Sequence, residues 1–147
     1  MIASHTSKTL LALIFLVLTS LTALGQGEPV GIQVTMNPDN PWLLRVTLRS
    51  FARDRITFYK HLLPWGNRYS MILVAVTSSG RSIDRVFPED EPSSKEVSLG
   101  PGESLTGDVD LHDVFRGMDT ALKKGDVHLF WAYQAPDGLG IPRWSGG

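Results

Sequence analysis

The chain has 147 residues, 14 lysines and arginines against 15 aspartates and glutamates, a formal net charge of −1, and no cysteine. This near-neutral balance favours neither nucleic acid nor a membrane surface as a partner, because both attract strongly basic proteins. The absence of cysteine excludes disulfides, thiol catalysis and a lipidated bacterial signal. The length suits a single domain.

The N-terminus has the pattern of a secretory signal. Lys8 precedes an unbroken apolar run at 10–18, and a small-x-small cleavage site, ALG, follows at 23–25. The run is too short to span a bilayer, which needs roughly 20 apolar residues. We therefore predict a cleaved signal peptide at 1–25 and one domain at 26–147, with no stable membrane span after cleavage. The alternative is an uncleaved N-terminal anchor.

The exported protein is predicted to be bacterial, with a periplasmic or secreted location. Secreted eukaryotic domains of this size often carry disulfides or an Asn-x-Ser/Thr glycosylation site. Here Asn37 and Asn40 precede proline, and Asn67 is followed by Arg68 and Tyr69. Both eukaryotic features are therefore missing from the sequence.

Short β-type runs separated by Gly, Pro, Asn and Asp begin at residue 30. The run 30–36 precedes an NPDNP turn, and the run 42–50 alternates apolar and polar residues. A period of two is typical of a half-buried strand, so Leu44, Val46 and Leu48 should face the core.

Three further runs complete the first half, at 55–62, 69–77 and 82–87. In the first of these, Ile56 and Phe58 should face inward. The second, YSMILVAVT, is apolar on both faces, which predicts a central strand that is covered on both sides. An SSGR turn separates it from the third.

The second half continues with runs at 95–99, 104–112 and 127–134. In the middle run, the apolar residues should face the core and the polar residues should face solvent. The inward set is Leu105, Val109 and Leu111, and the outward set is Asp108, Asp110 and His112. The sequence MDTALKKGD predicts a short helix near 119–124, with Asp119 as its N-terminal cap and Gly125 just beyond its end.

These runs predict an all-β fold, an immunoglobulin-like antiparallel β-sandwich with one short helix near 119–124. One core should collect the inward-facing residues from several strands. Its predicted members are Leu44, Val46, Leu48, Ile56, Phe58, Leu73, Val109, Leu111, Leu129 and Trp131. The mostly basic segment 45–68 and the mostly acidic segment 84–113 should neutralise each other in the folded chain.

The sequence EVSLGPGESLTGDVDLHDVF at 96–115, followed by GDVHLFWAYQ at 125–134, resembles the closing part of exported immunoglobulin-like accessory domains. Proteinase-inhibitor domains and the N-terminal domains of deuterolysin-type metalloproteases have this form. The resemblance covers about a third of the chain and implies a sandwich but no activity, because the fold hosts unrelated functions. Such domains usually carry a further strand, for which only GIPRW at 140–144 is available here. An open sheet edge would invite an edge-strand homodimer.

Catalytic and metal-binding patterns are weak. His61, His112 and His128 lack ligand spacing, and Asp108 with its neighbouring aspartates is typical of a solvated strand face. The sequence has no G-x-S-x-G nucleophile elbow. We therefore expect no enzyme activity, no cofactor and no metal.

Aromatic residues are the remaining candidates for function. In 127–134, Trp131 and Tyr133 should lie in the core, while the opposite face with His128, Phe130 and Ala132 is unusually apolar and should be covered by something. Two other tryptophans stand beside arginine in Pro- and Gly-rich connections, LPWGNRYS and IPRWSGG. Exposed tryptophan with arginine is typical of binding hot spots. The candidate ligand-binding residues are Trp65, Arg68, Tyr69, Arg143 and Trp144.

Two interpretations of the tryptophans stay open. Trp65 can plug the end of the core, or it can form a binding lip together with Trp144. The sequence favours an exported, non-catalytic binding or accessory module that docks a protein partner, such as an envelope protein, through a sheet edge or aromatic loops. The alternative is a domain that binds carbohydrate or a cell-envelope polysaccharide through Trp65 and Trp144.

Overall fold

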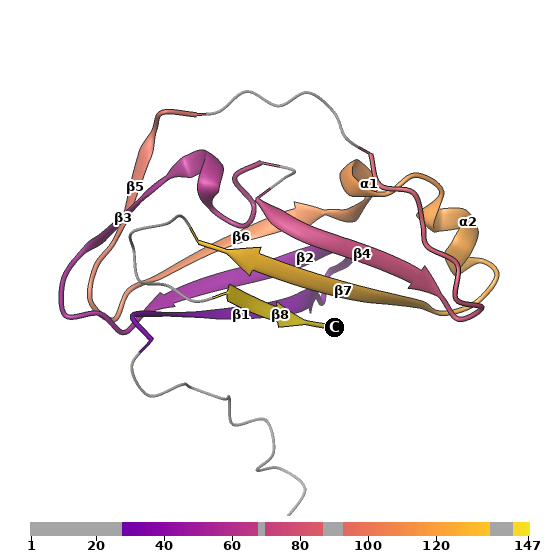
Figure 1. Cartoon of the computed structure of the whole chain (residues 1–147), viewed down its shortest axis with the longest axis horizontal. Helices are drawn as coiled ribbons and strands as arrows, with labels where there is room; N and C mark the ends of the chain where they lie inside the picture. Colours follow the sequence, from indigo (N-terminus) through magenta and orange to yellow (C-terminus); the bar gives the residue numbers. More distant parts are fainter. Residues whose placement is uncertain (1–27, 68–69, 87–92, 136–142) are drawn as a thin grey trace, which may run out of the picture.

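The computed structural model describes residues 28–67, 70–86, 93–135 and 143–147. They form an all-β fold in which every named strand pair is antiparallel, which confirms the predicted all-β class (Figure 1). The predicted signal peptide at 1–25 lies outside the described residues. In the described part, no helix is long and apolar enough to cross a membrane.

The first sheet has three strands in the order β1-β2-β6. Its strands are β1 (Val30–Asn37), β2 (Asn40–Ser50) and β6 (Ser104–Asp110). The β1–β2 hairpin turns through Pro38 and Asp39, and the Asn37 side chain accepts a hydrogen bond from the Asp39 backbone N–H at 3.0 Å. Such side-chain contacts favour a tight reversal of the chain.

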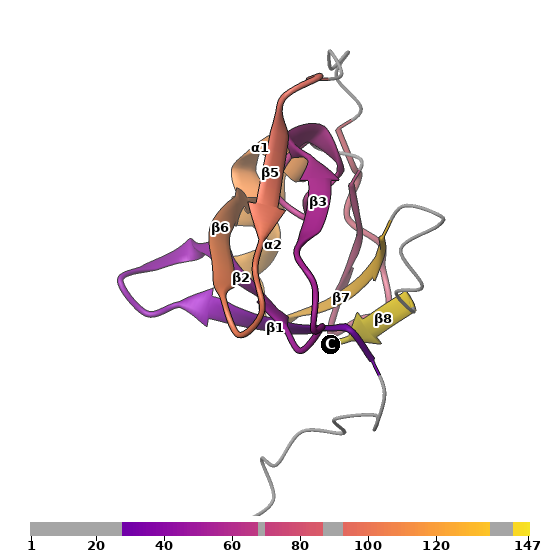
Figure 2. The same ribbon diagram turned by 90° about the vertical axis from the view of Figure 1, so that its left-hand side faces the viewer.

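The second sheet also has three strands, in the order β4-β7-β8. Its strands are β4 (Met71–Thr77), β7 (Val127–Gln134) and β8 (Arg143–Gly146). Of the predicted segment GIPRW, Arg143 and Trp144 belong to the short last strand β8, which pairs with β7 so that Trp144 lies opposite Tyr133. The rest of GIPRW lies outside the described residues. A separate pair, β3 (Ile56–Tyr59) and β5 (Glu96–Leu99), stands at one end of the molecule (Figure 2).

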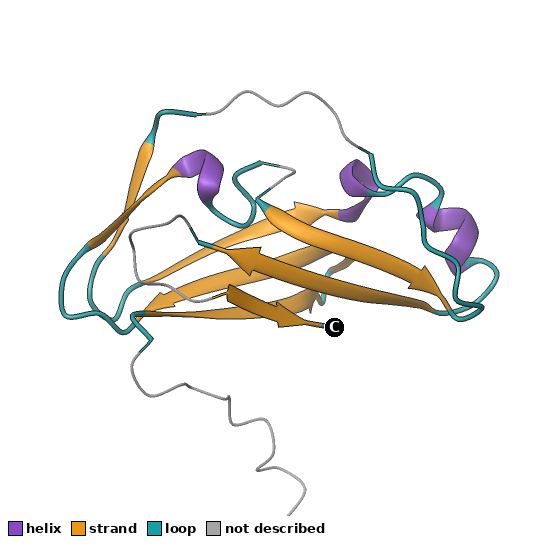
Figure 3. Ribbon diagram, in the orientation of Figure 1, coloured by secondary structure: helices purple, strands orange, loops and turns teal. Residues whose placement is uncertain are grey.

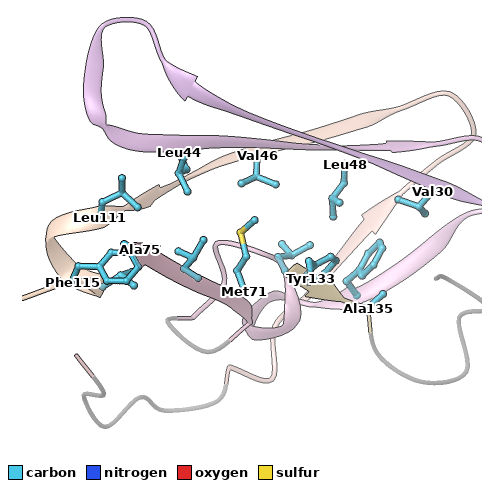
Figure 4. Packing of buried hydrophobic residues seen from close by; sticks show 14 of the residues in the cluster. Val30, Leu44, Val46, Leu48, Met71, Ala75, Leu111, Phe115, Tyr133 and Ala135 are labelled. Carbon is cyan, nitrogen blue, oxygen red and sulfur yellow. The ribbon is translucent and has the colours of Figure 1, made fainter. Parts of the chain in front are cut away.

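The core lies between the two three-stranded sheets. Leu44, Val46 and Leu48 of β2 point across it toward Met71 and Ala75 of β4 (Figure 4). Every residue that the alternation predicts for the core is either buried in this cluster or packed against it. The strand period of two thus assigns the inward face correctly on both sheets.

The predicted central strand YSMILVAVT is wrong in one respect. β4 has β7 as its strand partner in the sheet, and its residues alternate between buried and exposed. Met71 and Leu73 are buried, whereas Ile72 and Val74 are exposed. Only one face of β4 therefore belongs to the core. The predicted strand at 82–87 is reduced to isolated bridges at Ser82 and Arg85, within its described residues.

Within the described residues, three short helical segments lie between strands (Figure 3). They are the 3₁₀ turn η1 (Lys60–Leu62), α1 (Leu111–Val114) and α2 (Met118–Leu122). The predicted helix near 119–124 is present as α2, but its N-cap is Gly117 and not Asp119. Gly117 has φ 80°, a left-handed conformation that glycine adopts without the clash of a Cβ atom.

Two predicted strands end early because a helical turn follows each. The run 55–62 is a strand only from Ile56 to Tyr59, and η1 begins at Lys60. The run 104–112 ends at Asp110, whose carboxylate accepts a hydrogen bond from the His112 backbone N–H at 2.9 Å and so caps α1. An aspartate in this position satisfies a backbone donor that the first helical turn leaves unpaired.

Candidate functional site

The LPWGN corner, residues 63–67, is a tightly closed turn. The Gly66 N–H donates a hydrogen bond to the Leu63 carbonyl at 2.7 Å. A Cβ atom at Gly66 would lie 1.9 Å from the Lys60 carbonyl oxygen, so only glycine fits there. Asn67 closes the corner, because its amide donates to the His61 carbonyl at 2.6 Å and its side-chain oxygen accepts from the Ser70 N–H at 2.8 Å.

This corner presses the Trp65 ring against β6. A Cβ atom at Gly107 would lie 2.3 Å from ring atoms of Trp65, so the ring occupies the space that a side chain at position 107 would need. Trp65 is half-buried and packs against the core cluster. The backbone of β6 is therefore part of the surface on which the indole rests.

The remaining surface of Trp65 borders a concavity that we call the acidic cleft. It has a volume of about 290 Å³ and is lined by Trp65, Asn67, Asp108, Val109, Asp110, Asp113 and Val114. The carboxylates come from the outward face of β6 and from α1, as the alternation of 104–112 predicts for Asp108 and Asp110. An aromatic edge and several hydrogen-bond acceptors thus face the same small volume.

One carboxylate of the acidic cleft has a basic neighbour. Arg45 of β2 forms an ion pair with Asp108, with 3.2 Å between Nε and Oδ1. The hydrogen bond to Asp108 raises the pKa of Arg45 above its ordinary value. This contact joins the basic segment 45–68 to the acidic segment 84–113, as we expect from the uneven charge of the sequence.

The three candidate histidines have separate surroundings. His112 lies beside Asp110 and Trp42. Its Nδ1 lies 3.2 Å from Asp110 Oδ1, and its ring lies 4.1 Å from the Trp42 ring, measured between centroids. His61 contacts the Ser93 carbonyl instead, and His128 is exposed on β7. Within the described residues, no group of three or more His, Cys, Asp or Glu side chains could hold a metal ion.

The second candidate tryptophan, Trp144, is anchored independently of Trp65. Its ring stacks on Tyr133 with 5.8 Å between centroids and 5° between planes, and its Nε1 donates to Glu28 Oε2 at 3.3 Å. Tyr133 in turn donates to the Leu62 carbonyl at 2.9 Å, and burial raises the pKa of Tyr133 above its ordinary value. Trp144 is thus half-buried and has its own partners.

Of the five candidate residues of the predicted binding lip, the structure describes Trp65, Arg143 and Trp144. Trp65 contacts Gly107 and Trp144 contacts Tyr133, and no ring contact joins the two tryptophans in the described part of the chain. Arg143 is exposed at the start of β8. The other two candidate residues, Arg68 and Tyr69, lie outside the described residues.

The most exposed apolar cluster lies elsewhere, on the outer face of β4 and β7. Ile72 is 59% exposed, Val74 44% and Phe130 51%. Val74 lies directly opposite Phe130 in the ladder, and Ile72 lies opposite Ala132. Facing residues on paired strands are in reach of one another, so these side chains form one patch, which we call the outer face.

The composition of the outer face sets it apart from other exposed apolar residues. Its neighbours in the outward rows of β4 and β7 are Val76, His128 and Gln134, so the rows contain no lysine, arginine, aspartate or glutamate. The other large exposed apolar side chains lie on different elements. They are Met36, Phe51, Tyr59 and Leu122.

The sequence identified half of the outer face. The alternation of VHLFWAYQ places Phe130 and Ala132 on an unusually apolar outward surface. It missed Ile72 and Val74, because an apolar run on both faces of a strand is also the pattern of a strand buried on both sides. The pairing of β4 with β7 could have been the signal, since it puts the two apolar outward rows side by side.

The two edges of this sheet differ. The edge of β4 is covered by the following segment: the Ile83 N–H donates to the Ala75 carbonyl at 2.9 Å, and Arg85 Nη2 donates to the Met71 carbonyl at 3.0 Å. The opposite edge is β8, whose named strand partner is β7 alone. β8 has four residues, so it offers a short edge for pairing.

Comparisons with known proteins found no matching family model, no matching curated protein and no matching solved structure. The resemblance to immunoglobulin-like accessory domains, and with it the immunoglobulin-like sandwich, therefore stays a prediction.

Proposed function

We propose that this protein is an exported, non-catalytic binding module that docks a protein partner through the outer face of β4 and β7. The observation that carries the proposal is the joint exposure of Ile72, Val74 and Phe130 on facing positions of two paired strands. Contiguous exposed apolar side chains are unfavourable in water and mark surfaces that bind other molecules. A protein partner fits best, because an apolar sheet face can pack against an apolar surface of another protein.

The outer face has more support as a docking surface than a sheet edge has. Edge pairing needs a row of free backbone groups. The neighbouring segment already binds the carbonyls of Ala75 and Met71 on β4, and β8 is short. An edge-strand homodimer through β8 would also leave Ile72 and Phe130 in water.

Export is part of the proposal and rests on the sequence. The basic residue Lys8, the apolar run at 10–18 and the small-x-small site at 23–25 favour a cleaved signal and a periplasmic or secreted bacterial protein. A partner in that compartment would be an envelope protein. Sequencing the N-terminus of the exported form tests this part, and a start near Gln26 is the expected result.

Site-specific photo-crosslinking tests the docking surface directly. A photoreactive amino acid at position 74 lies on the outer face, and one at position 98 lies on an exposed strand position of β5 as the control. In the cells that produce the protein, we expect position 74 to give one discrete adduct, identified by mass spectrometry, that position 98 does not give. Replacing Phe130 by threonine in the same chain should abolish that adduct.

Two outcomes would contradict the proposal: no adduct at position 74, or the same set of adducts at both positions. An adduct with twice the mass of the mature chain would support docking and identify a second copy as the partner. Melting curves for each labelled chain establish that the fold is kept.

A second candidate function is carbohydrate binding at the acidic cleft. The specific observation in its favour is that Trp65 borders a volume of about 290 Å³ together with Asn67 and three aspartates, which can accept hydrogen bonds from sugar hydroxyls. Trp144 adds less, since one of its ring faces lies on Tyr133. Affinity electrophoresis in gels containing envelope polysaccharide tests it. Asp108→Asn should reduce the retardation, whereas Asp119→Asn, outside the cleft, should not.

A further inference from the structure

The end of β4 lies near α2 (Figure 1). Residues of the turn after β4, of α2 and of the loops beside α2 line a third surface, which we call the basic groove. It has a volume of about 360 Å³. The turn after β4 supplies Arg81, the loop before α2 supplies Arg116, and the turn after α2 supplies Lys124. Neither the outer face nor the acidic cleft shares a residue with it.

Backbone hydrogen bonds hold the walls of the basic groove in place. The Ser78 N–H donates to the Asp126 carbonyl at 3.0 Å, which joins the turn after β4 to the chain beyond α2. The Arg116 N–H donates to the Asp84 carbonyl at 2.9 Å, which joins the loop before α2 to the segment along β4. The groove is therefore formed by the fold itself.

The charges of the groove are unbalanced. Arg81, Arg116 and Lys124 line it together with the two carboxylates Asp84 and Asp126. The ion pairs found among the described residues involve Arg45 and His112, and none includes any of these three cations. Three basic side chains from three segments thus border one volume, and no carboxylate of the described residues forms an ion pair with them.

We propose that the basic groove binds a small phosphorylated sugar. Charge-assisted hydrogen bonds from arginine and lysine suit a phosphate group. Asp84, Asp126 and the serine hydroxyls of the turn after β4 can accept hydrogen bonds from sugar hydroxyls. The volume lies at the small end of the range of about 300–1,000 Å³ that is usual for small-molecule sites. This site would act independently of docking at the outer face.

Calorimetric titration of the mature protein with glucose 6-phosphate, glucose and inorganic phosphate tests the proposal. Glucose 6-phosphate should bind saturably, glucose should not bind, and inorganic phosphate should bind more weakly than the sugar phosphate. Lys124→Gln and Arg116→Gln should each weaken glucose 6-phosphate binding by about 10-fold, the effect of losing one charge-assisted hydrogen bond. Lys123→Gln is the matched control, because Lys123 is adjacent in sequence but does not line the groove.

The absence of saturable glucose 6-phosphate binding up to about 10 mM, a very weak affinity, would overturn the site. Equal effects of Lys123→Gln and Lys124→Gln would overturn it too, and inorganic phosphate binding as tightly as glucose 6-phosphate would overturn the assignment of a sugar. If a variant fails to fold, NMR decides the case: the changes in backbone amide chemical shifts of the unaltered protein are measured on addition of glucose 6-phosphate. Shifts confined to residues 77–84 and 116–126 would support the groove, and scattered shifts would overturn it.

Discussion

The two tryptophan corners and the outer face of β4 and β7 use apolar side chains in opposite ways. Trp65 and Trp144 stand in Pro- and Gly-rich connections that have the composition of binding loops, yet each ring rests on its own partner, Gly107 or Tyr133. Ile72 and Phe130 stand in regular strands, yet they lie in water. The tryptophans of the two corners thus pack against the fold, whereas the apolar side chains of the outer face stay exposed.

The difference shows that residue type alone is a poor guide to a binding surface. A tryptophan has a large area to bury and buries it wherever a gap is available. A valine on a strand has no choice of direction, because the pleat fixes its face. An apolar side chain that the backbone forces outward is therefore the stronger sign of a missing partner.

The largest expected effect comes from the Trp65 corner. Trp65→Ala should lower the free energy of unfolding by about 2–4 kcal/mol, slightly less than a fully buried aromatic, because the ring is half-buried and leaves a gap against Gly107. Urea denaturation measures the change. An unchanged urea midpoint would show that the Trp65 ring does not stabilise the core. The contrast between the tryptophan corners and the outer face would then be wrong for Trp65.

Trp144→Ala should cost less, about 1–2 kcal/mol, because it removes one ring stack and one hydrogen bond at a half-buried position. The same denaturation series measures it. Trp144→Phe serves as the control, since it keeps a ring against Tyr133 and loses only the bond to Glu28. If Trp144→Ala and Trp144→Phe lower the free energy of unfolding equally, the whole effect comes from the hydrogen bond to Glu28.

Tyr133 gives a pH-dependent test of the corner that holds Trp144. Burial raises the folded-state pKa of Tyr133, so the folded state keeps its proton at a pH where the unfolded state has lost it. The stabilisation is fully present below the unfolded pKa of about 10 and is lost as the pH rises above it toward the folded pKa. Tyr133→Phe should cost about 1 kcal/mol at pH 7, through the bond to the Leu62 carbonyl.

Above pH 10 the difference in unfolding free energy between the unaltered protein and Tyr133→Phe should shrink or change sign, because phenylalanine has no proton to lose. Denaturation at pH 8 and pH 10.5 measures both differences. Parallel loss of stability in the two proteins would indicate that Tyr133 is not the group responsible.

The smallest expected effect comes from the outer face. Val74→Thr keeps the shape and strand preference of the side chain and should change the free energy of unfolding by no more than about 0.5 kcal/mol, as for an exposed site. Leu73→Ala, one position away on the inner face, should cost about 2–5 kcal/mol. Thermal melts compare the two. A large cost for Val74→Thr would mean that the chain itself covers this face.

The sequence predicted the parts of the fold that depend on local alternation. The inward residues of β2 and the bounds of β7 follow from a period of two, which needs no knowledge of distant neighbours. The prediction from alternation failed for β4, because an apolar run has the same appearance whether its second face is buried or exposed. The sequence pattern also missed α1, since this helix begins with one hydrogen bond that the His112 N–H donates to the Asp110 carboxylate.

The candidate site was harder to predict for a related reason. The sequence of the corner LPWGN does not reveal whether its tryptophan is exposed or packed. The packing of Trp65 depends on Gly107, which is remote in sequence. The cations of the basic groove are likewise scattered over three segments, so no local motif announces them. A site assembled from residues that are distant in sequence can be identified only once the fold shows which of them are neighbours.

The contact between Trp65 and Gly107 also has an evolutionary consequence. Because the indole occupies the volume that a side chain at position 107 would need, Gly107 can be replaced only if a smaller residue takes the place of Trp65. Homologues should divide into lineages that retain the large–small pair and lineages in which a smaller residue at 65 accompanies a side chain at 107. That coupled substitution would let this corner be recognised across sequences too divergent to align elsewhere.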